Sequence, residues 1–111
     1  MSSTLALLYI PIDTQKHAEE LATLALSHKL AACVNILPGG QSLYLWEGHI
    51  ENASECYMLF KTLPEKQHEL KTFILAHHPY DIPAILTLSP DCCAPFLGYL
   101  STSLGCRTEE K

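Results

Sequence analysis

The chain has 111 residues, a net charge of −5 and a hydrophobic content of 48%. This length suits one hydrophobic core, so a single domain over residues 1–111 is expected. Charged residues make up only 17% of the chain, below the roughly 25% of typical soluble domains, which indicates that the surface is sparsely charged or partly covered by another subunit. The negative charge excludes nucleic acid as a natural partner, because Lys and Arg must neutralise its phosphates.

Membrane insertion and secretion are not expected either. No apolar run approaches the roughly 20 residues that span a bilayer, and the apolar residues 5–10 have neither a basic flank nor a cleavage site of small residues. The five cysteines are odd in number and irregular in spacing, unlike a secreted disulfide framework. Reduced thiols and a cytoplasmic location are therefore expected.

The first half of the chain predicts a strand, a helix and a long hairpin. A strand over residues 4–10 precedes Asp13 or Thr14, either of which can cap a helix that ends near His28. Residues 31–37 predict a buried strand that is interrupted by a turn or bulge at residues 38–40 and resumes at residues 42–46. The chain then returns over residues 50–62, which gives a long hairpin.

The second half predicts a helix, a strand and a terminal helix. Thr62 and Glu65 fit a capping box for a helix that runs to His77, with Leu63 on its apolar face. A strand follows at residues 84–89, and Asp91 can cap a last helix that is closed by Gly105. Residues 106–111 are expected to fray.

This order predicts an α+β fold of the ferredoxin-like β-α-β-β-α-β kind with an added C-terminal helix. In that plan two helices cover one face of a four-stranded antiparallel sheet. The other face needs cover from the terminal helix or from further subunits.

Metal binding is the first chemistry to test, because the chain has six histidines and five cysteines. A preformed local site is disfavoured, since no Cys-x-x-Cys or His-x-x-x-His motif occurs, and His17 and His28 would lie roughly 16 Å apart on one helix. The adjacent Cys92 and Cys93 favour soft metals only weakly. A metal site must therefore be assembled by the fold or between subunits.

Cys33 has two competing interpretations. In an apolar strand it is most simply a core thiol. As a nucleophile it would need a base such as His78 and an orienting carboxylate such as Glu55, and nothing in the local sequence couples the three. We therefore expect no enzymatic activity and no required cofactor.

Four segments occur in the order seen in the CutA divalent-cation tolerance proteins: residues 30–35 (LAACVN), 42–48 (SLYLWEG), 61–62 (KT) and 78–83 (HPYDIP). The chain resembles this family over roughly residues 5–104. The resemblance implies a homotrimer, similar in architecture to the PII signalling proteins, in which long hairpins pair between subunits. It also implies a link to copper and other divalent metals, while relatives connected with anchoring of acetylcholinesterase imply that an unidentified protein partner exists.

By position, Cys33 and His78 match the family's strand cysteine and the histidine before Pro-Tyr, and are the implied metal ligands. The resemblance also implies a ligand or interface pocket at the subunit junction, formed by Trp46, Glu55, Lys61 and Tyr80. The last helix departs from the family pattern, with Phe96 and Tyr99 where Tyr and Trp are common. Cys92, Cys93 and Cys106 are outside the motif and receive no role.

The resulting expectation is a cytoplasmic, trimeric protein that binds divalent or soft metal ions such as copper and contributes to metal tolerance. The alternative is a PII-like signalling module that binds a small anion or metabolite between subunits. In that alternative Lys61 supplies the charge, and Trp46 or Tyr80 supplies the packing surface.

Overall fold

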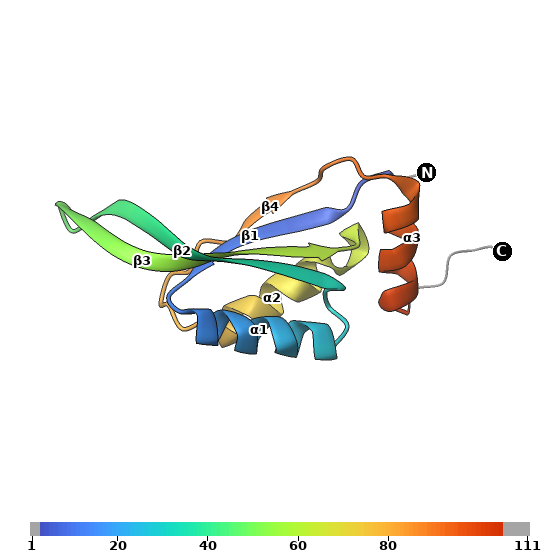
Figure 1. Ribbon diagram of the computed structural model, residues 1–111, viewed down its shortest axis with the longest axis horizontal. Helices are drawn as coiled ribbons and strands as arrows, with labels where there is room; N and C mark the ends of the chain where they lie inside the picture. The colour runs from blue at the N-terminus through green and yellow to red at the C-terminus, as the bar shows by residue number, and fades with distance from the viewer. Residues whose placement is uncertain (1–2, 106–111) are drawn as a thin grey trace.

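The computed structural model describes residues 3–105, which form a four-stranded sheet with helices on one face and at one end (Figure 1). In chain order the elements are β1 (Ala6–Ile12), α1 (Gln15–Ser27), β2 (Cys33–Trp46), β3 (His49–Thr62), the 3₁₀ turn η1 (Pro64–Lys66), α2 (Gln67–His77), β4 (Leu86–Leu88) and α3 (Ala94–Ser103). The strands are antiparallel in the order β2-β3-β1-β4. This confirms the predicted ferredoxin-like plan with its long hairpin and C-terminal helix.

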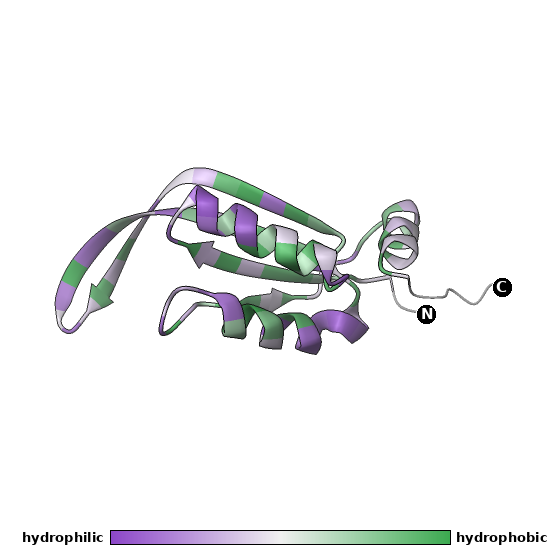
Figure 2. Ribbon diagram, turned by 90° about the horizontal axis from the view of Figure 1, so that it is seen from below, coloured by the Kyte–Doolittle hydropathy of each residue, from purple (hydrophilic) through white to green (hydrophobic). Residues whose placement is uncertain are grey.

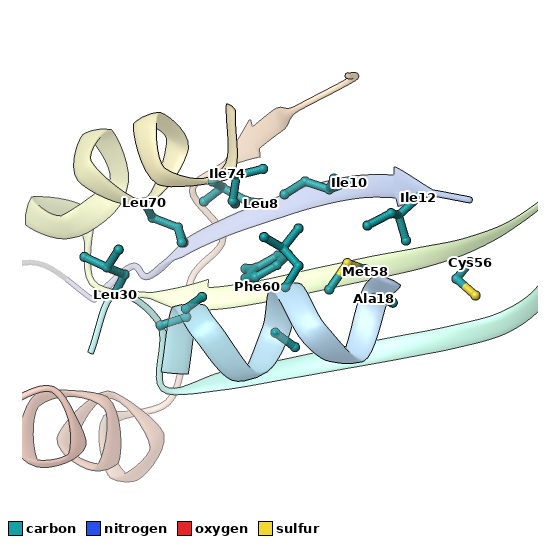
Figure 3. Close-up of a cluster of buried hydrophobic side chains, with 14 of the residues drawn as sticks. Leu8, Ile10, Ile12, Ala18, Leu30, Cys56, Met58, Phe60, Leu70 and Ile74 are labelled. Atoms are coloured by element: carbon teal, nitrogen blue, oxygen red, sulfur yellow. The ribbon is translucent and has the colours of Figure 1, made fainter. Parts of the chain in front are cut away.

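The core lies between the sheet and the two helices α1 and α2 (Figure 3). Residues alternate between buried and half-buried along β1 and along the second half of β3, because successive strand side chains point to opposite faces. One set therefore faces the helices, and its members are Ala6, Leu8, Ile10, Ile12, Cys56, Met58 and Phe60. They meet Ala18 and Ala25 of α1 and Leu70 and Ile74 of α2.

Helix α1 begins as predicted. The Thr14 hydroxyl accepts a hydrogen bond from the His17 backbone N–H at 3.1 Å, which satisfies one of the free donors of the first turn. Its C-cap is His28. Both predicted bounds are confirmed.

A β-bulge interrupts the side-chain alternation of β2 between Leu37 and Gly40. Leu37 pairs with Tyr57 and Gly40 pairs with Glu55, so β2 advances three residues where β3 advances two. The extra residue shifts the alternation, and as a result Cys33 and Leu37 before the bulge face the same side as Ser42 and Tyr44 after it. The predicted turn or bulge at residues 38–40 is therefore a bulge inside one long strand.

Beyond the bulge the hairpin projects past the helices as an arm, defined here as residues 41–54 (Figures 1 and 2). Its tip is a two-residue turn with positive φ at Glu47 and Gly48, the geometry that matches strand twist in tight hairpins. The arm makes the molecule elongated, with extents of 55 × 25 × 23 Å. Leu43, Leu45 and Ile50 on the arm are 65%, 76% and 74% exposed.

The sheet face opposite α1 and α2, called the open face, carries large apolar side chains. Strand alternation and pairing place on it Leu7, Tyr9, Cys33, Leu37, Tyr57, Leu59, Lys61, Leu86 and Leu88. Leu37, Leu86 and Leu88 are each about half exposed. Helix α3 covers only one end of the sheet, where Leu5, Leu63, Leu100 and Leu104 form a second buried cluster.

The predicted capping box at Thr62 is wrong. Thr62 is the last residue of β3 and is in phase with Phe60, so its side chain points into the core and is fully buried. Its hydroxyl oxygen has no hydrogen-bond partner among residues 3–105. The helix instead begins through η1 after Leu63, without a side-chain cap, and Leu63 packs in the second cluster beside α3 and not on the α2 face.

The predicted cap of the last helix is also wrong. Asp91 forms an isolated β-bridge with Thr4, and the N-cap position of α3 is held by Cys93. Strand β4 is limited to three residues, where residues 84–89 were expected. The prediction that residues 106–111 fray falls outside the described residues. Within residues 3–105, no helix is long and apolar enough to cross a membrane.

Candidate functional site

A groove of about 710 Å³ lies between the hairpin arm and the loop that follows α2. Its charged lining residues are three carboxylates, Glu51, Glu55 and Asp81, and no Lys, Arg or His lines it. The other lining residues are Pro11, Ser42, Tyr44, Trp46, Ala53, Tyr80, Ile82 and Ala84. The groove therefore combines aromatic walls with negative charge.

Tyr80 joins the loop to the base of the arm. Its hydroxyl donates a hydrogen bond to the Glu55 carboxylate at 2.6 Å, a short distance typical of a bond to a charged acceptor. Burial, followed by the hydrogen bond to Glu55 and the charge of that carboxylate, raises the pKa of Tyr80 well above its ordinary value. Tyr80 is therefore a persistent donor that fixes one wall of the groove.

His78 anchors the same loop and is buried, with only 8% of its surface exposed. Its Nε2 donates to the Pro11 carbonyl at 2.9 Å, and its Nδ1 accepts from the Tyr80 backbone N–H at 3.1 Å. A carbonyl can only accept and a backbone N–H can only donate, so the ring is the neutral Nε2–H tautomer. Because both ring nitrogens are engaged, a metal could bind His78 only after one of these bonds opens.

Cys33 and Lys61 lie at the other end of the sheet. They are paired across β2 and β3 on the open face, and Lys61 is also paired with Leu7 of β1. The Lys61 ammonium lies 5.5 Å from the Phe96 ring centroid, a cation–π contact with α3. Cys33 is half-buried, which places the sulfur at the sheet surface and not in the helix-covered core.

The structure divides the six sequence-predicted residues into two groups. Trp46 and the Glu55–Tyr80 pair line the groove, with His78 directly behind it. Cys33 and Lys61 are distant, because Pro11, the partner of His78, lies four residues along β1 from Leu7, which is roughly 13 Å at about 3.3 Å per residue. One chain thus assembles neither the Cys33–His78 metal pair nor the Cys33–His78–Glu55 catalytic arrangement.

In the described part of the chain, no three His, Cys, Asp or Glu side chains are grouped so that they could hold a metal ion. The alternative anion site is not assembled in one chain either, because Lys61 is absent from the groove lining.

Sequence reasoning missed several groove residues. Tyr44 and Glu51 are a cross-strand pair, and Ser42 shares a 2.7 Å hydrogen bond with Tyr57. The alternation of side chains along residues 42–46 and 51–55 could have predicted that Ser42, Tyr44 and Glu51 share one face, once the position of the bulge was known. Alternation could not have predicted Asp81 as a groove residue, because its position depends on how the loop folds back over the arm.

Phe96 and Tyr99, the two residues of the last helix that differ from the family pattern, still connect α3 to the sheet. The Tyr99 hydroxyl donates to the Ala32 carbonyl at 3.1 Å, and its ring packs at a tilt on Phe96 with centroids 5.5 Å apart. Helix α3 is thus bonded to the residue that precedes Cys33.

These observations define the class of protein. It is a ferredoxin-like α+β domain extended by a hairpin arm, with an apolar open face and an acidic, aromatic groove at the base of the arm.

Comparison with known proteins identifies the family. The family model described as "CutA1 divalent ion tolerance protein" matches residues 6–103. The divalent-cation tolerance protein CutA of Yersinia pestis (strain Pestoides F) is 46% identical over 88 residues, covering 78% of this chain and 74% of that protein. The chain belongs to the CutA1 divalent ion tolerance protein family.

Solved structures agree with this assignment. CutA1 from Ehrlichia chaffeensis superposes with a TM-score of 0.89 at 32% identity, covering 94% of this chain and 98% of that one. CutA from Synechococcus elongatus PCC7942 gives a TM-score of 0.88 at 36% identity, covering 93% and 92%. The predicted family and fold are both confirmed.

Proposed function

We propose that this chain is a homotrimeric protein of the cytoplasm that binds soft or divalent metal ions, copper first among them, and so contributes to metal tolerance. The proposal of an oligomer rests on the apolar surface that is exposed on the arm and on the open face. Leu43, Leu45 and Ile50 of the arm are about two-thirds to three-quarters exposed, and Leu86 and Leu88 are half exposed. Apolar patches of this kind mark interaction surfaces.

Metal binding is proposed to occur at the junction between copies. The family description supports a role in divalent ion tolerance, yet Cys33 and His78 of one chain lie at opposite ends of the sheet. A site that uses both must therefore take them from different copies. His78 would contribute through Nδ1 or Nε2 only after its bond to Tyr80 or to Pro11 opens.

The state of the cysteines supports the proposed location. Cys33, Cys56, Cys92 and Cys93, the cysteines in the described part of the chain, are all free thiols. Free thiols persist in reducing compartments. They are also the ligands that select soft ions such as copper(I).

The alternative function, binding of a small anion or metabolite at the junction, has less support. The groove presents three carboxylates, which repel an anion. Lys61 would have to reach it from a second copy.

The oligomer is tested by light scattering and sedimentation of Leu45→Glu and Leu86→Lys. Each variant places a charge on a surface proposed to be buried, so folded monomers are expected. The matched control is Leu75→Glu on α2, which is 54% exposed but lies outside the arm and the open face, and it should remain a trimer. A wild-type chain that is monomeric at micromolar concentration would contradict the proposal.

The metal site is tested by calorimetric titration of copper into wild type, Cys33→Ser and His78→Gln. Loss of binding in Cys33→Ser supports the assigned thiol. Binding that is unchanged in stoichiometry and affinity in both variants overturns the assignment.

A further inference from the structure

The groove at the base of the arm is hollow because small side chains line its middle. Ser42 and Ala53 are a cross-strand pair, and both line the groove. Two residues away on the same face of β3 lie Glu55 toward the base of the arm and Glu51 toward its tip, where Glu51 is paired with Tyr44. Larger groups therefore stand at both ends of the hollow, with little side-chain volume between them.

The carboxylates of the groove are not paired with a cation inside residues 3–105. The single ion pair in this part of the chain joins two residues that do not line the groove. Glu55 accepts the Tyr80 hydrogen bond through one of its two oxygen atoms, and an ionised carboxylate offers about four lone-pair sites. The groove therefore concentrates uncompensated negative charge, which raises the local concentration of cations.

Aromatic rings line the same groove. Tyr44 and Trp46 are 47% and 51% exposed, so much of their surface is open to a ligand, and Tyr80 is held in place by its bond to Glu55. The face of an aromatic ring attracts an ammonium group, and its apolar surface gains free energy by covering methylene groups. Rings beside carboxylates thus favour a ligand that is both cationic and aliphatic.

We propose that this groove binds a linear aliphatic polyamine. Its terminal ammonium groups bind Glu51 and Glu55, and its methylene chain lies between them over Ala53. The two glutamates are four residues apart on one face of β3, which separates their Cα atoms by roughly 13 Å at about 3.3 Å per residue. A ligand with a charge at each end can reach both carboxylates. The site uses none of the proposed metal ligands and goes beyond the proposed function.

Other classes of ligand suit the groove less well. Across the described residues, no three His, Cys, Asp or Glu side chains are grouped for a metal ion, so the carboxylates of the groove are too widely spaced to share one bare cation. An anion is repelled by the same charges. The groove volume of about 710 Å³ lies within the range of about 300–1,000 Å³ that is typical of sites for small organic molecules.

Trp46 allows the site to be tested directly, because it is the only tryptophan in the chain and lines the groove. Spermidine titrated into the wild-type protein in its native oligomeric state should change Trp46 fluorescence saturably, and calorimetry should give one site per chain. Putrescine is too short to reach both glutamates and should bind about tenfold more weakly. Magnesium ions test charge alone, and neither they nor the dianion glutarate should give a saturable response at the same concentrations.

Single substitutions separate the two ends and the middle of the site. Glu51→Gln and Glu55→Gln each remove one charge and should weaken spermidine binding about tenfold; the glutamine at position 55 keeps an oxygen that can accept from Tyr80. Ala53→Leu fills the hollow without changing its charge and should also weaken binding. The matched control is Glu69→Gln, which changes an exposed glutamate of α2 outside the groove lining and should retain wild-type affinity.

Three results would overturn the proposal. The first is the absence of a saturable response in the wild-type protein, which would also be the outcome if a second copy of the chain filled the groove. The second is a magnesium response equal to that of spermidine. The third is an affinity that is unchanged in both Glu51→Gln and Glu55→Gln. The proposed metal site and oligomer fail or succeed independently, because their tests use different variants.

Discussion

The Tyr80 hydroxyl donates a 2.6 Å hydrogen bond to the Glu55 carboxylate and so connects the loop after α2 to the base of the hairpin arm. Residues 25 positions apart in sequence thereby set one wall of the groove. The same loop is held from behind by His78 through its bond to Pro11. The groove is thus supported by two bonds between distant segments.

Removal of the Tyr80 hydroxyl should weaken the fold measurably. We expect Tyr80→Phe to lower the free energy of unfolding by about 1 kcal/mol, because a half-buried bond to a charged acceptor is lost. Urea denaturation of wild type and variant measures the difference. The control is Tyr99→Phe, which removes the exposed bond to Ala32 and should cost less; a larger loss at Tyr99 would contradict this ranking.

The raised pKa of Tyr80 predicts a loss of stability at alkaline pH. In the folded state burial and Glu55 raise the pKa of Tyr80, whereas in the unfolded chain it returns to about 10. Above about pH 10 the unfolded state therefore binds fewer protons than the folded state, and the free energy of unfolding falls as pH rises. Denaturant midpoints measured from about pH 9 to 11 should fall less steeply for Tyr80→Phe; equal slopes would argue against this assignment.

Local patterns predicted the parts of the fold that depend on neighbouring residues. Alternation in residues 50–62 and the glycines at 39–40 were sufficient to place the hairpin and its irregularity. The Thr62 prediction failed because the capping-box motif is local, whereas strand phase fixed the direction of the side chain. Thr62 follows Phe60 on the same face of β3, so its side chain is buried in the core and is not available to cap the helix.

The candidate site was less predictable for the same reason. The family resemblance grouped Cys33 with His78 as metal ligands. Matching residue types do not specify the distance between two side chains, and the strand register places these two far apart. The Tyr80–Glu55 bond depends on the path of a loop containing two prolines, which no periodicity describes. Tertiary packing, and not local propensity, decides where such groups meet.

Thr62→Val distinguishes the observed role of Thr62 from the capping box. The hydroxyl is fully buried and unpaired within the described residues, and an unsatisfied buried polar group costs about 1–3 kcal/mol. Replacement by the isosteric valine should therefore raise the free energy of unfolding by about 1 kcal/mol, measured by denaturant titration. A capping hydroxyl would give the opposite sign, a loss of about 1 kcal/mol.

Gly40→Ala tests the packing that joins the arm to the open face. An added Cβ would lie on the Tyr57 ring, and that ring is held by its hydrogen bond to Ser42 and by stacking on Tyr9 at 6.0 Å between centroids. Overpacking of this kind typically costs about 1–3 kcal/mol, so the thermal midpoint should fall.

The matched control for Gly40→Ala is Gly98→Ala. Gly98 lies inside α3, where a Cβ meets nothing within 4 Å, and alanine there should stabilise the chain by about 0.5–1 kcal/mol because it restricts the unfolded state. The loss at Gly40 should also shrink in a Tyr57→Ala background, since the clash with the ring is then removed. A penalty that persists in that background would show that the backbone at the bulge, and not the Tyr57 ring, requires glycine at position 40.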